Sequence, residues 1–182
     1  IDAEFTKYPP VGGTADLKAA ICERYAADYG VTYGEREVIA CAGGKQALYN
    51  TALALFDRGD EVIVPAPLWP TLTEQVKLAD ATPVVVRTSP ADGFAIAAAP
   101  ILEAMTPRTR GVILNSPCNP TGALVSEDEF AVLAREAARR GIWLVLDLCY
   151  EQLIYDATPH NLPRLVADHC RDLAVICGSA SK

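Results

Sequence analysis

Residues 142–146 are Ile142-Trp143-Leu144-Val145-Leu146, a continuous apolar run that ends at Asp147. Helical patterns occupy the chain on either side of it, as around 14–30 and 126–141. Continuous rather than alternating apolar strands are typical of a parallel sheet that is covered on both faces. We therefore predict an α/β fold, a three-layer sandwich around a mostly parallel sheet. The other short apolar runs predict strands at 38–41, 61–64, 83–86, 111–114 and 173–177.

Residues with capping or backbone-restricting properties set the predicted boundaries. Thr14 and Gly30 are expected at the start and the end of one helix. Ser126, with Glu129 three residues later, predicts a reciprocal capping box at the start of another. Pro65 is expected to stop the strand that precedes it, because proline lacks a backbone N–H donor.

The composition excludes several classes of protein. A net charge of −7 over 182 residues argues against a nucleic-acid-binding surface. No apolar stretch reaches membrane-spanning length, and the first residues lack a signal sequence. The six cysteines show no C-x-x-C spacing and only two histidines accompany them, which argues against a metal site. We expect reduced cysteines in the core of a cytoplasmic protein. Because the chain begins with Ile1 rather than Met, we also expect its gene product to begin earlier.

Polar or glycine-rich segments follow four of the predicted strands. In an open α/β sheet, ligands bind outside the carboxyl ends of the strands, so these segments are expected to meet at one site. Each feature alone has a more common explanation, such as a solvated lysine, a tight turn or a capping aspartate. The four segments are Ala42–Gln46, Asn115–Gly122, Asp147–Tyr150 and Ser179–Lys182.

Together these segments supply the chemistry that holds pyridoxal phosphate. An amine just beyond a buried strand can lose solvation and react with an aldehyde, a role open to Lys182. A carboxylate at Asp147 can keep a pyridine nitrogen protonated, so that the ring withdraws electrons. Gly43-Gly44-Lys45 precedes a helix whose first N–H groups can bind a phosphate, although its spacing matches neither common nucleotide-binding motif. Tyr150 can reach the ring oxygen, and Trp69 can stack on the ring.

The motif Asn-Ser-Pro-Cys-Asn-Pro-Thr-Gly at 115–122 carries a specific resemblance, through its spacing to Asp147, Tyr150 and Ser179-x-x-Lys182. The chain resembles the large domain of the class I and II aminotransferases, the fold-type I pyridoxal-phosphate enzymes. Within this family, its sequence motifs are most similar to those of bacterial aspartate aminotransferases. The resemblance covers essentially all of residues 8–182.

The resemblance implies a role for individual residues. Lys182 is the implied catalytic residue, which joins the cofactor covalently and carries a proton between the substrate α-carbon and the cofactor. Gly13 and Asn119 are implied to bind substrate, and no residue is assigned to a metal. The implied cofactor-binding residues are Lys182, Asp147 at the ring nitrogen, Tyr150 and Asn119 at the ring oxygen, Trp69 on the ring face, Gly44, Lys45 and Ser179 at the phosphate, and Tyr8 at the phosphate of the neighbouring subunit.

The resemblance also implies the domain organisation and the activity. Residues 1–7 are expected to be the remnant of an N-terminal arm, and residues 8–182 an incomplete large domain that ends at the cofactor lysine. A small C-terminal domain with a carboxylate-binding arginine is then missing. The implied enzyme is a homodimer with a shared active site. It moves an amino group between an amino acid, aspartate as the first choice, and a 2-oxo acid such as 2-oxoglutarate.

Two alternatives stay open at this point. A pyridoxal-phosphate-dependent C–S or β-lyase can use the same fold and the same cofactor-binding site. A transcription regulator can carry a domain of this kind as a cofactor sensor, and the gene sequence upstream of Ile1 would then encode a basic DNA-binding domain. Leu68 replaces an aromatic residue that is common in near relatives, which leaves the preferred amino acid open.

Overall fold

The computed structural model describes residues 6–156 and 158–181. The chain divides into two compact units, Ile1–Ala42 and Gly43–Lys182. The second unit carries all the strands and most of the helices. Among the described residues, no helix is both long enough and apolar enough to cross a membrane.

The first unit contains α1 (Ala15–Tyr29) and the short 3₁₀ helix η1 (Glu35–Glu37). Thr14 Oγ1 accepts a hydrogen bond from Leu17 N at 3.4 Å, which caps the first turn of α1. Gly30 ends the helix with a φ of +66°, a left-handed conformation that glycine adopts without strain. Both predicted boundaries of this helix are therefore correct.

The strand predicted at 38–41 is not present in the described structure, where these residues form no strand and belong to no sheet. Ala40 N donates to Gly12 O at 3.0 Å, and Ile39 is 71% exposed. A strand needs a neighbouring strand to complete its hydrogen-bond ladder, and this segment has none within its unit. An apolar run alone was therefore misleading here.

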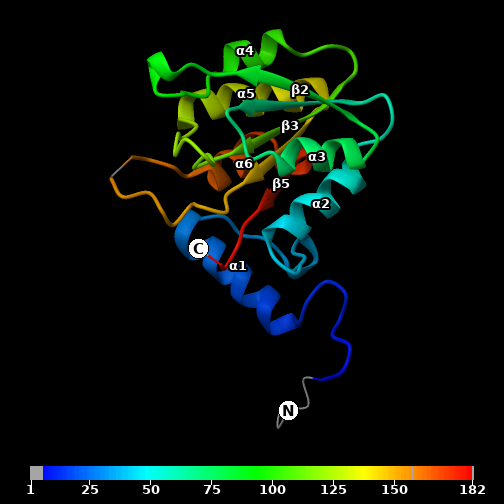
Figure 1. Ribbon diagram of the computed structural model, residues 1–182. Helices are drawn as coiled ribbons and strands as arrows, with labels where there is room; N and C mark the ends of the chain where they lie inside the picture. The colour runs from blue at the N-terminus through cyan, green and yellow to red at the C-terminus, as the bar shows by residue number, and fades with distance from the viewer. Residues whose placement is uncertain (1–5, 157, 182) are drawn as a thin grey trace. The chain divides into compact units, whose positions relative to one another are not determined.

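The second unit is built on five parallel strands in the order β2-β1-β3-β4-β5 (Figure 1). This arrangement confirms the predicted α/β fold. The strands are β1 (Glu61–Ala66), β2 (Thr82–Arg87), β3 (Thr109–Asn115), β4 (Trp143–Asp147) and β5 (Ala174–Cys177). The helices are α2 (Gly44–Leu55), α3 (Thr71–Leu78), α4 (Ala98–Glu103), α5 (Glu127–Arg140) and α6 (Leu162–His169), with 3₁₀ turns η2 (Pro90–Asp92) and η3 (Arg171–Leu173).

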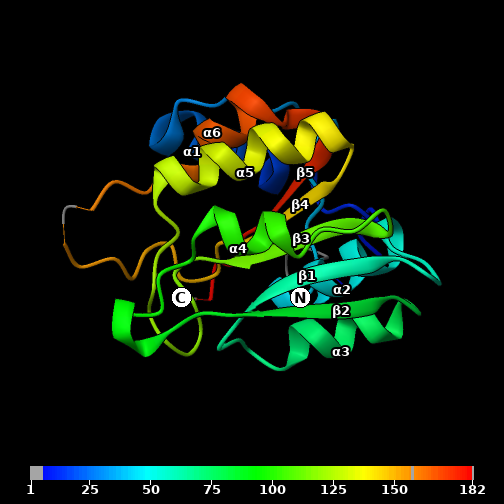
Figure 2. The same cartoon turned by 90° about the horizontal axis from the view of Figure 1, so that it is seen from above.

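The central strands bury both faces of the sheet, which explains their continuous apolar sequences. Successive side chains of a strand point to opposite faces. Val112 and Leu114 of β3 belong to one core cluster, with buried residues of α4, α5 and α6. Ile113 belongs to a second cluster, with buried residues of α2 and α3. Figure 2 shows α5 and α6 side by side on one side of the sheet and α3 on the other.

β1 continues through Pro65 instead of stopping before it, so this predicted boundary was wrong. The ladder with β3 covers only Glu61 to Ile63, whereas the ladder with β2 continues to Ala66. Beyond Ile63 the strand has a neighbour on one side only. Proline is tolerated in a strand that is locally an edge, because its missing N–H then costs no ladder bond.

Ser126 and Glu129 form only half of the predicted capping box. Ser126 Oγ accepts from Glu129 N at 3.3 Å, as the prediction requires. The carboxylate of Glu129 accepts from Ala98 N, the first residue of α4, at 2.5 Å instead of returning to Ser126. The glutamate therefore ties the starts of two helices together.

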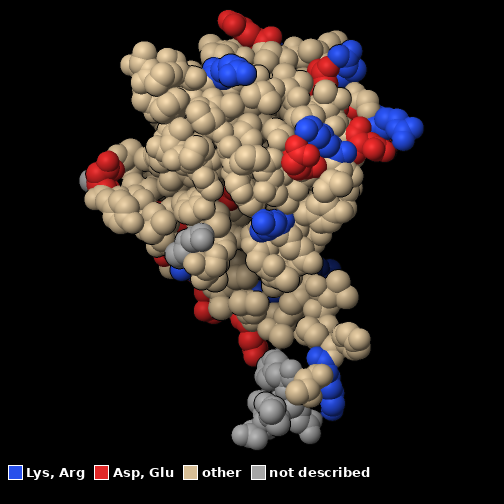
Figure 3. Space-filling model, viewed as in Figure 1, with Lys and Arg blue, Asp and Glu red and all other residues tan. Residues whose placement is uncertain are grey.

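Only two of the six cysteines, Cys170 and Cys177, are fully buried, and the other four are half-buried. The expectation of core cysteines holds for these two. Figure 3 shows positive and negative side chains next to one another on the face that it presents, over the region of α3. Ion pairs in this region include Lys77–Glu74 at 2.7 Å. Exposed pairs of this kind contribute little to stability.

Candidate active site

A pocket of about 290 Å³ lies at the carboxyl edge of the sheet. β2 lies on one side of β1, and β3, the next strand in sequence, lies on the other side. Ligands of open α/β sheets bind at such a reversal of strand order. The residues that line the pocket come from the strand ends, the segments after them and the start of α2; they are Gly43, Gly44, Lys45, Leu48, Trp69, Asn115, Asn119, Asp147, Cys149, Tyr150, Ser179 and Ser181.

Asp147 is the last residue of β4 and is 3% exposed. Its Oδ1 accepts from Cys149 N at 3.0 Å. Burial raises the pKa of this carboxyl group, and the N–H of Cys149 opposes that shift only in part. Among residues 6–156 and 158–181, no Lys, Arg or His forms an ion pair with it. A ligand that carries a positive charge would therefore be stabilised beside Asp147.

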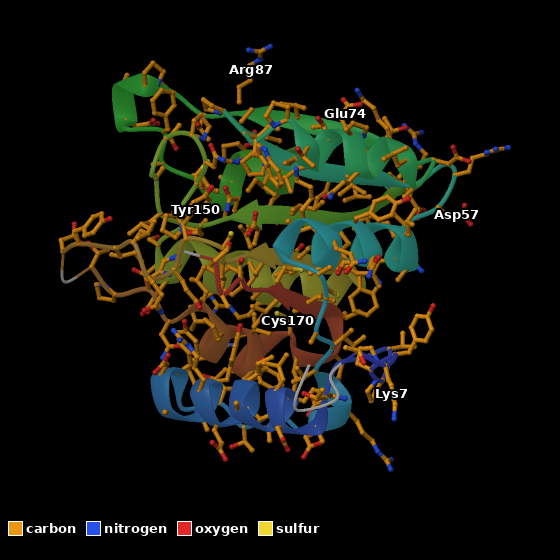
Figure 4. The ribbon with its side chains drawn as sticks, turned by 60° about the horizontal axis from the view of Figure 1, so that its bottom comes forward. Lys7, Asp57, Glu74, Arg87, Tyr150 and Cys170 are labelled. Atoms are coloured by element: carbon orange, nitrogen blue, oxygen red, sulfur yellow. The ribbon has the colours of Figure 1, made fainter. Side chains whose placement is uncertain are left out.

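Asn119 and Tyr150 meet on the side of the pocket formed by the 115–122 motif. Asn119 Nδ2 lies 3.4 Å from Tyr150 Oη, and Asn119 N donates to Asn115 Oδ1 at 2.6 Å. Figure 4 shows Tyr150 in the segment that follows β4. These two side chains offer an amide N–H and a phenol O–H to a ligand oxygen.

The start of α2 provides an anion-binding end to the pocket. Gly43, the residue before the helix, has a φ of +91° and provides no side-chain cap. Gln46 N and Ala47 N donate to Gly43 O at 3.1 and 3.2 Å, so the N–H groups of Gly44 and Lys45 are the ones left for a ligand. A Cβ placed on Gly44 would lie 3.5 Å from Ser179 Cβ, so this turn and the segment after β5 are neighbours. Ser179 Oγ lies 2.8 Å from Ser181 Oγ, which adds hydroxyl groups to the same end.

Lys45 lies against Trp69, with its Nζ 5.2 Å from the centre of the indole ring. This distance is typical of a cation–π contact. Gln75 Nε2 donates to Lys45 O at 3.0 Å and fixes the main chain at the start of α2. The pocket therefore contains a lysine amine beside its aromatic wall, and Lys45 is distinct from the predicted cofactor lysine.

Three predicted site residues are not part of this pocket in the described structure. Lys182 lies outside the described residues. Tyr8 and Gly13 belong to the first unit, where Tyr8 is fully exposed and Gly13 has a φ of +96°. A Cβ on Gly13 would lie 2.6 Å from Ala40 Cβ, so the chain passes very close to Ala40 at this point. Their roles at the pocket remain predictions.

Several residues line the pocket without having been predicted as site residues. Asn115 and Cys149 are the polar ones at the ends of the central strands, and Ser181 accompanies Ser179. For Asn115 a signal was available, because it is the first residue of the 115–122 motif and directly follows an apolar run. For Cys149, its position between Asp147 and Tyr150 was the only indication.

Comparison with known proteins identifies the family. The family profile described as "Aminotransferase class I and II" matches residues 2–182. The chain belongs to the class I and II aminotransferases. Among similar proteins, the aspartate aminotransferase of Geobacillus stearothermophilus is 40% identical over 177 residues, which are 97% of this chain and 45% of that protein. The aspartate/prephenate aminotransferase of Cereibacter sphaeroides is 39% identical over 183 residues, 100% of this chain and 46% of that protein.

Solved structures of aminotransferases have the same fold. The aspartate aminotransferase of Thermus thermophilus with maleate superimposes with a TM-score of 0.90 at 37% identity, over 97% of this chain and 45% of that one. The N-succinyldiaminopimelate aminotransferase of Mycobacterium tuberculosis gives a TM-score of 0.93 at 34% identity, over 100% of this chain and 47% of that one. The chain thus spans a little under half the length of these aminotransferases.

Class I and II aminotransferases use pyridoxal 5′-phosphate, and the residues of this pocket fit that cofactor. The buried Asp147 carboxylate suits a protonated pyridine nitrogen. The uncapped start of α2, together with the hydroxyls of Ser179 and Ser181, suits a phosphate. The donors of Asn119 and Tyr150 suit an oxygen on the ring. All these groups line one pocket.

Proposed function

We propose that residues 8–182 are the cofactor-binding large domain of an aminotransferase, which moves an amino group between an amino acid and a 2-oxo acid. Asp147 carries the proposal. It is a buried carboxylate with no cationic partner in the described part of the chain, in a pocket whose other end is suited to an anion. Burying an unpaired charge is costly, so the site is best explained by a ligand that brings the missing cation.

Asp147 would hold a proton on the ring nitrogen of pyridoxal phosphate. The bound cofactor then supplies an electron sink for the bond that breaks at the substrate α-carbon. Asn119 Nδ2 and Tyr150 Oη would donate to the ring oxygen and orient the ring. Trp69 would cover one face of the ring and exclude water from it.

Gly44, Lys45 and Ser179 would bind the phosphate. Gly44 and Lys45 form the first residues of α2, where backbone N–H groups and the helix dipole favour a negative charge. Ser179 would donate its hydroxyl from the segment after β5. This arrangement would fix the cofactor at the end opposite to Asp147.

Lys182 is the proposed catalytic residue, on the basis of the family resemblance. Its amine would hold the cofactor covalently before substrate arrives. It would then carry a proton from the substrate α-carbon to the cofactor, and from the cofactor back to an α-carbon in the second half of the reaction. Gly13 and Asn119 are the proposed contacts of the substrate carboxylate.

Aspartate and 2-oxoglutarate are the first substrate pair that we propose, in a cytoplasmic enzyme. The support is that several relatives at 35–40% identity are named aspartate aminotransferase. Similar folds also belong to aminotransferases named for other substrates, such as N-succinyldiaminopimelate. A panel of amino donors with the full-length protein is therefore the appropriate assay.

The decisive experiment measures amino transfer by the full-length protein after loading with pyridoxal phosphate. We expect aspartate and 2-oxoglutarate to give oxaloacetate and glutamate. Removal of Asp147 by Asp147→Ala should lower kcat/KM by about 10²–10³-fold, as for other electrostatic groups that stabilise developing charge. Asp147→Glu should keep much more activity. Release of ammonia and a 2-oxo acid without an amino acceptor would instead support a β-lyase.

We also propose a homodimer in which Tyr8 contacts the cofactor phosphate of the neighbouring subunit. Tyr8 is fully exposed and precedes Pro9-Pro10, which favours an extended arm. The full-length protein should be dimeric, and Tyr8→Phe should weaken pyridoxal-phosphate binding without changing the dimer. Tyr155→Phe, at a tyrosine that is 90% exposed, is the matched control. A fully active monomer would contradict the proposal.

A further inference from the structure

We infer that Asn115 is a positioning residue of the pocket, which sets the spacing between Asp147 and Asn119. The inference rests on the proposed function, because these two residues would contact opposite sides of one cofactor ring. Asn115 is the last residue of β3 and is 7% exposed. It lies directly opposite Asp147 in the parallel β3–β4 ladder.

The side-chain amide of Asn115 makes one hydrogen bond with each of its two ends. Nδ2 donates to the main-chain oxygen of Asp147 at 3.2 Å, and Oδ1 accepts from Asn119 N at 2.6 Å. These partners fix the orientation of the amide. The reversed orientation would set an NH₂ group against an N–H and an oxygen against a carbonyl oxygen.

The contact with Asn119 attaches the motif loop to the sheet. The loop is closed on itself by two backbone hydrogen bonds, from Cys118 N to Ala123 O at 2.9 Å and from Gly122 N to Cys118 O at 2.7 Å. These two bonds make it a compact loop. The bond from Asn119 N to Asn115 Oδ1 joins this loop to the end of β3.

Asn115 thereby completes a closed circuit around one side of the pocket. The circuit runs from Asn115 to the Asp147 main chain, along the turn to Tyr150, across to Asn119 through the 3.4 Å contact, and back to Asn115. A side-chain amide offers a donor and an acceptor in one rigid plane. The amide therefore couples the carboxylate at one side of the ring to the donors at the other.

Two substitutions at Asn115 distinguish the effects of its two hydrogen bonds. Asn115→Ala removes both bonds. Asn115→Asp keeps the size and the acceptor for Asn119 N, but it sets an anionic oxygen against Asp147 O and a second carboxylate near that of Asp147. Ser116→Ala is the matched control, because Ser116 is fully buried, and its Oγ accepts from Val125 N at 3.0 Å and lies 2.7 Å from His160 Nε2. Ser116 does not line the pocket.

The experiment uses the full-length protein with and without pyridoxal phosphate. The readouts are the Kd of the cofactor by absorbance titration, the pH midpoint of the absorption change of the bound cofactor, and the exchange rate of the Asn119 amide hydrogen without cofactor. For Asn115→Ala we expect faster exchange at Asn119, a shifted midpoint and a Kd raised by roughly 10–100-fold, by analogy with residues that orient the ligands of bound metals. Asn115→Asp should keep the slow exchange but still shift the midpoint. Ser116→Ala should lower the Tm without changing Kd or midpoint.

Two results are decisive against the inference. If both Asn115 variants keep the wild-type Kd and midpoint while only the Tm falls, Asn115 is structural and the inference is wrong. If Asn115→Ala does not fold, Asn115→Asp is sufficient. An unchanged pH midpoint of cofactor absorption in Asn115→Asp would likewise show that the inference is wrong. A third result separates the inference from the proposed function. If the wild-type protein does not bind pyridoxal phosphate but the variants show the expected exchange at Asn119, the proposed function is wrong while the hydrogen bonds of Asn115 are as described.

Discussion

The hydroxyl of Ser116 lies 2.7 Å from Nε2 of His160, across 44 positions of sequence. The same hydroxyl accepts a hydrogen bond from Val125 N at 3.0 Å. One residue further on, Asn161 N donates to Glu127 Oε1 at 2.7 Å. Two contacts therefore hold the end of the segment between β4 and α6 against the 115–122 motif and the start of α5.

His160 gives this contact a pH dependence. Burial lowers the pKa of the imidazole, and the nearby carboxylate of Glu127 opposes that shift. A lowered folded-state pKa adds stability above the unfolded value of about 6.5. That stability is lost as the pH falls through the folded-state pKa. We expect the free energy of unfolding to fall between about pH 7 and pH 5, and to fall less in His160→Gln.

Chemical denaturation across that pH range tests this expectation. His169→Gln, which removes the only other histidine, is the control for loss of a histidine. If His160→Gln shows the wild-type pH dependence, the burial of His160 has no consequence for stability.

Asp147 should destabilise the cofactor-free protein at neutral pH. Burial raises the pKa of this carboxyl group in the folded state. The free energy of unfolding is therefore unaffected by this group below its unfolded-state pKa of about 3.9, where it is neutral in both states, and falls as the pH rises toward the folded-state pKa. Without cofactor, Asp147→Asn should be more stable than wild type at pH 7, because it removes a buried charge that has no cationic partner among the described residues. The difference should disappear below about pH 4.

The matched control is Asp168→Asn, an exposed aspartate paired with Arg164, for which we expect a change of at most about 0.5 kcal/mol. Pyridoxal phosphate should reverse the order, because only wild type offers it a carboxylate. A cofactor-free Asp147→Asn protein that is less stable than wild type at pH 7 would contradict the account of this site.

Gly111 of β3 is expected to tolerate no larger residue. A Cβ there would overlap the ring of Phe56, at 2.6 Å from Cζ, and this ring is 5% exposed. Gly111→Ala should therefore lower the free energy of unfolding by about 1–3 kcal/mol. Phe56→Leu in the same chain should recover part of that loss by making space, so that the two changes are not additive. Gly12→Ala, with no atom within 4 Å of the added Cβ, is the control.

The sheet could be predicted from sequence because its central strands are buried on both faces. Five of six predicted strands are present, with bounds within two residues of the observed ones. The exception, at 38–41, is apolar but forms no strand, because strand pairing depends on the rest of the fold. The course of β1 past Pro65 depends on which neighbour it has at that point. α6 was not predicted; its start at Asn161, whose Oδ1 accepts from Arg164 N at 3.1 Å, lies in a short segment of mixed composition.

The pocket could be predicted because its residues follow strands that end at one edge. Seven of the predicted cofactor residues line it: Asp147, Tyr150, Asn119, Trp69, Gly44, Lys45 and Ser179. The part played by Asn115 depends on a side-chain hydrogen bond to Asp147, 32 positions away on the neighbouring strand, which no local pattern encodes. The same holds for the contact of Lys45 with Trp69.

The covalent site of the cofactor tests the central claim most directly. Borohydride reduction of the full-length protein loaded with pyridoxal phosphate, followed by peptide mapping, identifies the lysine that holds it. We predict a pyridoxyl group on Lys182 alone. In Lys182→Ala this label should be lost, and kcat should fall by about 10²–10⁴-fold. Lys45 is the competitor that the pocket itself offers. Label on Lys45, or spread over several lysines with Lys182 unmodified, would contradict the account.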